Sequence, residues 1–364
     1  MIFEQRLKNE EKILFKLRYL YTQYGYQPFK MSKFEEYDFY ARNKEFLVSD
    51  SVITFTDTHG KLLALKPDVT LSIIKNATEE KNTKNKVYYN ENVYRVSGSS
   101  REYKEIMQAG LECIGDLDLY DMYEVVSLSA KSLGLISDDY VLEISHMGIL
   151  SALLDTVTTD SEFKSLVVDC IRKKSEHELL ECCEKYEASS EATKMLTNLI
   201  KLYGAPSDVC EKLKAMKVSK EFENATEELC QLCQLLKDTK EYKNIRLDFS
   251  IVSDMNYYNG IVLAGYINGV CECVLFGGRY DKLISKMGKR GGGVGFAIYT
   301  DLLASFDKEC REYDVDVLLI HKPKTSVTSI QRAVEDLVAQ GKSVSVQMSI
   351  PKSLRYKELK EMED

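Results

Sequence analysis

The chain lacks any apolar run of the length that a membrane-spanning helix needs. Such a helix takes roughly 20 consecutive apolar residues, and polar or charged residues interrupt every hydrophobic stretch of this 364-residue sequence. Residues 1–17, MIFEQRLKNEEKILFKL, carry acidic side chains, with no apolar core and no cleavage site of the kind found in signal peptides. We therefore predict a cytoplasmic protein that does not contact a membrane.

Histidine is also scarce, and the cysteines do not form a zinc-type set. A lone C-x-x-C, Cys230 and Cys233, occurs in TEELCQLCQLLK, and no second C-x-x-C or C-x-x-H completes it. Leu229, Cys233 and Leu236 of the same stretch recur at helical spacing, so core packing is favoured over a metal or redox site. We predict neither a metal nor a cofactor. The histidines are scattered along the chain: His59, His146, His177 and His321.

Positive charge is limited, which argues against a nucleic-acid binder. The formal net charge is −8, and only KNTKNK (residues 81–86) and KMGKR (residues 286–290) are basic runs. We interpret both runs as solvated loops. The hydrophobic content of 44% is ordinary for a soluble globular protein, and the length suggests more than one domain.

The spacing of hydrophobic residues divides the chain into segments with helix-like and strand-like patterns. It predicts helices at residues 3–23 and 69–77, a hairpin about His59 and Gly60, and two strands joined by a Ser/Gly loop at 97–100. Residues 149–240 are rich in polar helices and indicate an inserted helical subdomain, in which one helix ends at Gly204 with Pro206 just beyond. After residue 312 the pattern is strand, helix, strand. We predict a larger domain at 1–310 and a small α/β unit at 311–364.

Two short segments raise the question of a ligand site. In KEIMQAGLECIG, alternation places Met107, Ala109, Leu111 and Cys113 on an apolar face and leaves Gln108, Gly110 and Glu112 on the other. Gly110 leaves room between an amide and a carboxylate for a small ligand, although a solvent-exposed polar face is the alternative. In IVSDMNYYNG, the Asn259–Gly260 pair alone predicts a hairpin turn.

Several motifs together resemble one family of enzymes. VYRVSGSSREYKEIMQAGLECIG resembles motif 2 of the class II aminoacyl-tRNA synthetases in its histidyl version, with Arg95 and Arg101 in place. LALKPDVT resembles that family's Leu-Arg-Pro-Glu-x-Thr segment, with Lys66 and Asp68 as conservative departures. NYYNGIVLAGY, FGGRYDKLISKMG and GVGFAIYTDLL are similar to the histidyl signature and motif 3. The resemblance covers about 1–305, excluding most of the helical insert.

The resemblance implies a fold: an α+β class II aminoacyl-tRNA synthetase-like antiparallel sheet flanked by helices. A helical insertion and a small C-terminal α/β unit complete it. That unit resembles the first half of an anticodon-binding domain cut short, which makes tRNA an unlikely partner. Class II cores pair through motif 1, which implies a homodimer.

Two arginines of the family are missing. In active histidyl-tRNA synthetases the tyrosine pair follows Arg-Gly-Leu-Asp, whose arginine is catalytic, and here Ser253 stands at that position, with Asp254 beside it. The motif 3 arginine that clamps ATP is replaced by Leu302, and Tyr299 replaces a small residue beside it. Loss of one transition-state donor costs on the order of 10²–10³ in rate, so we expect no adenylation.

The amino-acid half of the family's site remains. This pattern resembles the regulatory subunit of ATP phosphoribosyltransferase, a synthetase paralogue that acts in the first step of histidine biosynthesis. The resemblance implies histidine feedback, activation of a short-form catalytic subunit, and a homodimer within a hetero-octamer. The alternatives are a divergent active synthetase and a stand-alone histidine sensor. The GGRYD stretch is also consistent with a purely structural tight turn. The residues implied to bind L-histidine are Asp68, Thr70, Arg95, Gln108, Glu112, Tyr257, Tyr258, Gly277, Gly278, Arg279 and Tyr280.

Overall fold

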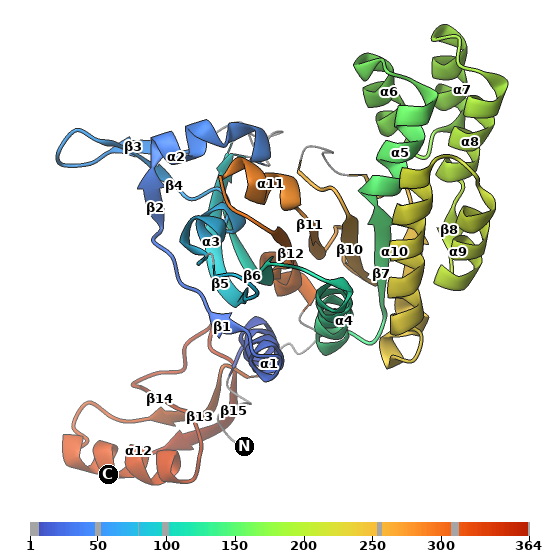
Figure 1. Ribbon diagram of the computed structural model, residues 1–364. Helices are drawn as coiled ribbons and strands as arrows, with labels where there is room; N and C mark the ends of the chain where they lie inside the picture. Colours follow the sequence, from blue (N-terminus) through green and yellow to red (C-terminus); the bar gives the residue numbers. More distant parts are fainter. Residues whose placement is uncertain are drawn as a thin grey trace. The chain divides into compact units, whose positions relative to one another are not determined.

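The computed structural model describes residues 7–47, 52–78, 80–96, 102–252, 257–306 and 313–362 (Figure 1). The chain separates into two units, one formed by Ile13–Phe306 and the other by Met1–Lys12 together with Asp307–Asp364. Ser253, Asp254, Arg101 and the loop at 97–100, all singled out above, lie outside the described residues. None of the helices within the described ranges has the length and apolar character to span a bilayer.

The larger unit is built on a nine-stranded sheet. Neighbouring strands run antiparallel except for two pairs, β1 with β5 and β7 with β9, which are parallel. The expected antiparallel class II-like sheet is therefore confirmed, with parallel pairing toward its two ends. In spatial order the strands are β1 (Gln27–Pro28), β5 (Lys84–Val96), β6 (Tyr103–Gly115), β12 (Gly292–Tyr299), β11 (Leu275–Arg279), β10 (Ile261–Ile267), β7 (Tyr140–His146), β9 (Ile245–Asp248) and β8 (Tyr203–Gly204).

Strands β5 and β6, each of 13 residues, pair over their whole length, and the alternation of β6 was predicted. Ala109, Leu111 and Cys113 lie in the main core, which they share with helices α1 (Asn9–Gln23) and α4 (Leu119–Ile136). Helix α4 begins where its sequence encodes a cap: the Asp118 carboxylate accepts from the backbone N–H groups of Tyr120 and Asp121. A second core cluster includes Tyr89 of β5 and the apolar residues of α3 (Thr70–Asn76).

The predicted helical subdomain is the connection between β7 and β9. Parallel neighbours require a crossover, and here it consists of helices that stack beside β7 in Figure 1. Cys230 and Cys233 are buried on the last helix, as core packing predicts. The helices are α5 (Met147–Val157), α6 (Ser161–Arg172), α7 (Glu176–Lys185), α8 (Ser190–Ile200), α9 (Pro206–Ala215) and α10 (Lys220–Leu236), followed by the 3₁₀ turn η3 (Lys240–Asn244).

Two turn predictions were wrong. Helix α8 ends at Ile200, not at Gly204, and Pro206 begins α9, where its missing N–H removes no hydrogen bond. Asn259–Gly260 forms no hairpin, because the strands on either side, β9 and β10, both flank β7 and do not pair. A primed turn needs positive φ at both positions, and neither residue has it.

The remaining elements of the larger unit include the predicted hairpin about His59–Gly60. It forms between β3 and β4, with β2 on the other side of β4. The bounds are β2 (Phe34–Glu36), α2 (Tyr37–Arg42), η2 (Lys44–Phe46), β3 (Thr54–Thr56), β4 (Leu62–Leu65), α11 (Asp281–Lys286) and η4 (Thr300–Phe306).

The smaller unit has the predicted strand–helix–strand order and one further strand. Strands β13 (Val315–Ile320), β14 (Val344–Gln347) and β15 (Tyr356–Glu361) form a parallel sheet, with helix α12 (Val327–Ala339) between the first two. The sequence pattern missed β15, because YKELKE carries alternating charges and is mostly exposed.

Candidate functional site

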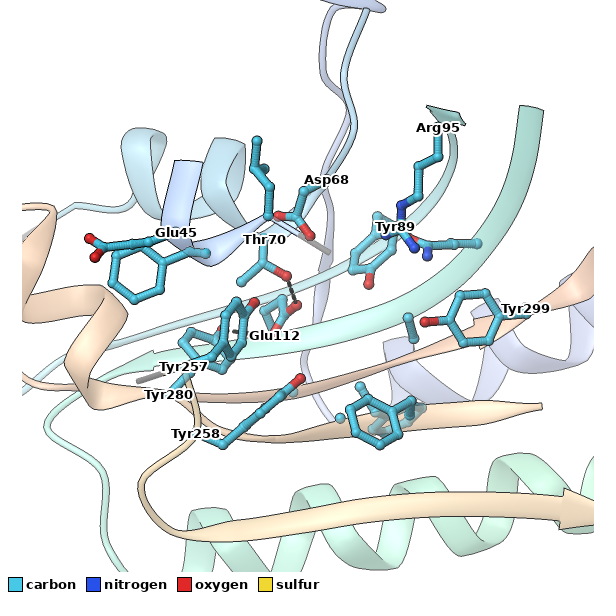
Figure 2. Close-up of a pocket in the computed structure, with 18 residues that line it drawn as sticks. Glu45, Asp68, Thr70, Tyr89, Arg95, Glu112, Tyr257, Tyr258, Tyr280 and Tyr299 are labelled. Atoms are coloured by element: carbon cyan, nitrogen blue, oxygen red, sulfur yellow. Dashed lines mark hydrogen bonds between the residues drawn. The ribbon is translucent and has the colours of Figure 1, made fainter. Parts of the chain in front are cut away.

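A cavity of about 390 Å³ lies on the sheet face that carries Gln108 and Glu112. Both side chains are buried, so the alternative of a solvent-exposed polar face does not hold. Figure 2 shows Tyr257 and Tyr280 on one side of Glu112, and Arg95 and Tyr299 on the other. The lining residues are Glu45, Phe46, Leu47, Asp68, Thr70, Tyr89, Arg95, Gln108, Glu112, Tyr257, Tyr258, Phe276, Gly277, Tyr280, Gly295, Phe296, Ala297 and Tyr299.

Glu112 is the most constrained acidic group of the cavity. Thr70 Oγ1 donates to its Oε1 at 2.8 Å, and the Tyr280 hydroxyl donates to its Oε2 at 2.6 Å. Its carboxyl reaches into space that a side chain at Gly295 would fill, because a Cβ there would overlap Oε2. Burial raises the pKa of Glu112 to about 8, against the lowering effect of the two hydroxyls.

Asp68 and Arg95 form a second polar group in the lining of the cavity. Asp68 Oδ1 accepts from the backbone N–H of Leu71 at 2.9 Å, at the start of helix α3. Arg95 Nε donates to the carbonyl oxygen of Pro67 at 3.0 Å, which holds the guanidinium beside that turn. Burial raises the pKa of Asp68, and the bond from Leu71 and the charge of Arg95 oppose the rise.

Tyrosines make up much of the remaining wall. The ring centroids of Tyr257 and Tyr258 lie 4.5 Å apart, and those of Tyr257 and Tyr280 lie 6.1 Å apart. Burial raises the pKa of all three phenols well above the usual value, so they stay neutral and can donate hydrogen bonds. Tyr299 closes the side toward Arg95, and burial likewise raises the pKa of its phenol.

The structure brings together nine of the eleven residues expected to bind a ligand. Gly278 and Arg279 are the two that do not line the cavity. A Cβ at Gly278 would lie 2.8 Å from the ring of Tyr258, so this glycine permits close packing. Arg279 is paired instead with Asp281 and Glu228. Leu302 lies in η4 and is half-buried.

Sequence reasoning misjudged Gly110 and missed Tyr89. A Cβ at Gly110 would lie 2.6 Å from the hydroxyl of Tyr89, so the room above this glycine is taken by a phenol and not left for a ligand. The β5–β6 register places Tyr89 directly opposite Gly110. Counting residues back from the 97–100 loop could have found this pair. The other lining residues that were missed are apolar or come from η2. The sequence contained no pattern that would assign these residues to a binding site.

The arrangement suits the binding of a small amphoteric molecule. Three carboxyls, those of Glu45, Asp68 and Glu112, line one cavity together with a guanidinium and an amide, and the aromatic rings supply apolar surface between them. Such a set can hold an ammonium, a carboxylate and a heteroaromatic ring at once. Among the described residues, no group of His, Cys, Asp and Glu side chains could hold a metal ion.

Comparison with known proteins places the chain among two kinds of relatives. The family model described as histidyl-tRNA synthetase matches residues 2–303. A protein of Caldanaerobacter subterraneus is 31% identical over 290 residues, covering 78% of this chain and 74% of its own length. One from Clostridium kluyveri is 30% identical over 313 residues, covering 82% and 78%. Both are named ATP phosphoribosyltransferase regulatory subunit.

Solved structures show the same fold at lower sequence identity. A Bacillus halodurans protein, described as an ATP phosphoribosyltransferase regulatory subunit/histidyl-tRNA synthetase, has a TM-score of 0.81 at 22% identity, covering 97% of this chain and 93% of its own. The histidyl-tRNA synthetase of Nostoc has a TM-score of 0.75 at 18% identity, covering 94% and 83%. A chain of the ATP phosphoribosyl transferase (HisG:HisZ) complex from Thermotoga maritima has a TM-score of 0.62 at 21% identity, covering 80% and 97%.

Proposed function

Because the chain belongs to the family of ATP phosphoribosyltransferase regulatory subunits, we propose that it binds free L-histidine in this cavity. Through that binding it controls a separate short-form catalytic subunit in the first step of histidine biosynthesis. The observation that carries the proposal is the convergence of Asp68, Arg95 and Glu112 on one cavity of about 390 Å³. The proposed binding set is the nine lining residues named in the sequence analysis.

Each part of histidine has a complementary group. Asp68 attracts the ammonium, Arg95 the carboxylate, and Glu112 with the Tyr258 hydroxyl meets the two imidazole nitrogens. With a pKa of about 8, Glu112 carries a proton near neutrality that it can share with or pass to the ring. An imidazolium–carboxylate pair at this buried position is stronger than the same pair in water.

The proposal assigns the chain no adenylating activity. Ser253 and Leu302 stand where the synthetases carry arginines, and Tyr299 fills space beside Arg95. The test is histidine-dependent exchange of pyrophosphate into ATP, and we expect none above background. Robust exchange at micromolar protein would favour a divergent synthetase instead.

Histidine binding is tested by calorimetry on the wild type and on Glu112→Gln. The variant keeps the shape of the side chain but replaces the titratable carboxyl by an amide. We expect histidine to bind more weakly by about 1–3 kcal/mol. Glu105→Gln is the matched control, because Glu105 lies on the same strand but is exposed. Equal histidine affinity in Glu112→Gln and the wild type would show that the ligand is bound elsewhere.

A further inference from the structure

Two chain segments behind the cavity interlock. The backbone N–H of Asn259 donates to the carbonyl of Arg279 at 3.1 Å, and the Asn259 side chain exchanges two hydrogen bonds with Asp281. A Cβ at Gly260 would lie 2.9 Å from Cδ of Arg279, so the arginine stem packs directly on this glycine. These contacts tie the segment of residues 257–260 to residues 277–281, where strand β11 ends and helix α11 begins, a stretch called the turn below.

Both segments also contribute side chains to the cavity. Tyr280 donates to Glu112, and the ring of Tyr258 packs against Gly278. Arg279 lies between Gly278 and Tyr280 in the sequence, but its side chain lines a different surface pocket, which residues of α10 also line. A movement of the turn would thus displace two cavity tyrosines, although Arg279 itself does not line the cavity.

Arg279 connects the turn to the helical segment. Its Nε donates to Asp281 Oδ2 at 2.8 Å, and its Nη1 lies 3.3 Å from Oε1 of Glu228 on α10. The same Glu228 oxygen lies 3.8 Å from Nε2 of His146, the last residue of β7 and the N-cap of helix α5. His146 is buried, and within the described chain neither of its ring nitrogens has a hydrogen-bond partner. The Glu228 carboxylate, on α10, thus lies close to both Arg279 of the turn and His146 at the start of α5.

The neighbouring groups favour the ionised form of the Glu228 carboxyl. His146 first, and then Arg279, lower the pKa of the Glu228 carboxyl below its usual value, against the effect of burial. The pair is partly exposed, with 26% of the Arg279 and 36% of the Glu228 side chain accessible. Such a pair contributes little to global stability, so its main effect is on the position of the groups it joins.

We propose that Arg279 is a positioning residue whose ion pair with Glu228 couples the occupancy of the cavity to helices α10 and α5. The ligand part of this inference rests on the proposed function, since it takes histidine as the occupant. The mechanical part, namely that the Arg279–Glu228 pair holds the turn in position, does not rest on the proposed function. Arg279→Lys keeps the charge but loses the fork that reaches Asp281 and Glu228 together.

The experiment compares Glu228→Gln with Glu227→Gln, the neighbouring residue on α10. Glu227 is exposed, pairs with Lys214 and accepts a hydrogen bond from Gln231, and it is the matched control for charge. Hydrogen exchange is measured first without histidine, at the amides of residues 258–260 and 277–281. We expect roughly two- to fivefold faster exchange in Glu228→Gln and in Arg279→Lys, as for the loss of a pair of this kind, and no change in Glu227→Gln.

The second part of the experiment measures histidine binding by calorimetry and repeats the hydrogen exchange in the presence of histidine. In the wild type, histidine should slow exchange in α10 as well as in the turn. Glu228→Gln should lose the slowing in α10 and bind histidine roughly three- to tenfold more weakly, a combination that a merely structural role would not produce.

The two arms separate the two hypotheses. If the turn of ligand-free Glu228→Gln exchanges like that of the wild type, the positioning role of Arg279 is overturned. The coupling is overturned if histidine binds the wild type but leaves α10 exchange unchanged. If histidine fails to bind the wild type at all, the proposed function and the ligand part of the coupling fall together, while the first arm still decides the mechanical part.

Discussion

Glu112 is a carboxyl placed where ionisation is costly, and its two hydroxyl partners offset only part of that cost. Its ordinary pKa of 4.5 rises to about 8 in the folded chain. Below 4.5 both folded and unfolded states hold the proton. Between the two values only the folded state does, so its stability falls as pH rises, by up to about 1.4 kcal/mol per unit.

Replacing this carboxyl should therefore change the pH dependence of stability. Glu112→Gln cannot titrate, so in the absence of ligand its free energy of unfolding relative to the wild type should rise steadily from pH 5 to pH 8. Urea denaturation of both proteins at pH 5, 6.5 and 8 measures the difference, from which the other titrating groups cancel. Parallel stability curves would show that Glu112 is ionised in the folded protein throughout.

Gly295 tests the same site from the neighbouring strand. Gly295→Ala should destabilise the chain by about 1–3 kcal/mol, because the new methyl group meets the Glu112 carboxyl and the backbone of β6. Histidine binding should weaken with it. Gly134→Ala is the control: its methyl would lie 3.5 Å from the Tyr140 ring, and in the interior of α4 we expect a gain of about 0.5–1 kcal/mol. Equal behaviour of the two variants in denaturation would contradict this account.

At the scale of elements, the sequence predicted best those segments whose local signals agree with their packing. Strand β6 alternates between an apolar core face and a buried polar face, and α3 (Thr70–Asn76) lies within the helix predicted at 69–77. Asn259 failed as a turn signal because its side chain is engaged by Asp281, far along the chain. Two-residue strands such as β1 and β8 exist only through their neighbours, so no local pattern encodes them.

The site was predictable to a similar degree. Gln108 and Glu112 followed from alternation, but Tyr89 and Gly295 depend on which strands become neighbours. Arg279 was expected in the cavity because the resemblance to the synthetase family implied it. The turn does reach the cavity, through Tyr280, while the adjacent side chain points toward α10.

Helix α10 offers a prediction at this scale. Ser219 caps its first turn, accepting from the backbone N–H of Phe222 at 3.2 Å. Ser219→Ala should lower the free energy of unfolding by about 1 kcal/mol. Ser190→Ala, an exposed serine in the first turn of α8, should change it by less than about 0.5 kcal/mol. Chemical denaturation compares them, and a neutral Ser219→Ala would mean that the cap is replaced by water.

At the scale of the whole molecule, the fold is that of the synthetase relatives, and the family is that of the regulatory subunits. Fold alone leaves the activity open. Under the proposed function, the distinction lies in which charged groups remain around the cavity and in what assembles with the chain.

Assembly provides the last prediction. We expect a homodimer alone and a larger, symmetric hetero-oligomer with a short-form catalytic subunit, whose activity histidine lowers. Light scattering of the chain, of the candidate partner and of their mixture measures this. A protein that stays monomeric alone and in the mixture would favour a stand-alone histidine sensor.

The tyrosine-rich wall of the cavity has an optical consequence. The chain contains no tryptophan and 23 tyrosines, and five of these, Tyr89, Tyr257, Tyr258, Tyr280 and Tyr299, line the cavity. Its near-ultraviolet absorbance and emission therefore come mainly from tyrosine side chains, and a ligand in the cavity would lie beside these five. Docking should alter the absorbance and emission of the unlabelled protein. A single Phe276→Trp substitution would place the chain's sole indole at the edge of the cavity, where its emission would report occupancy.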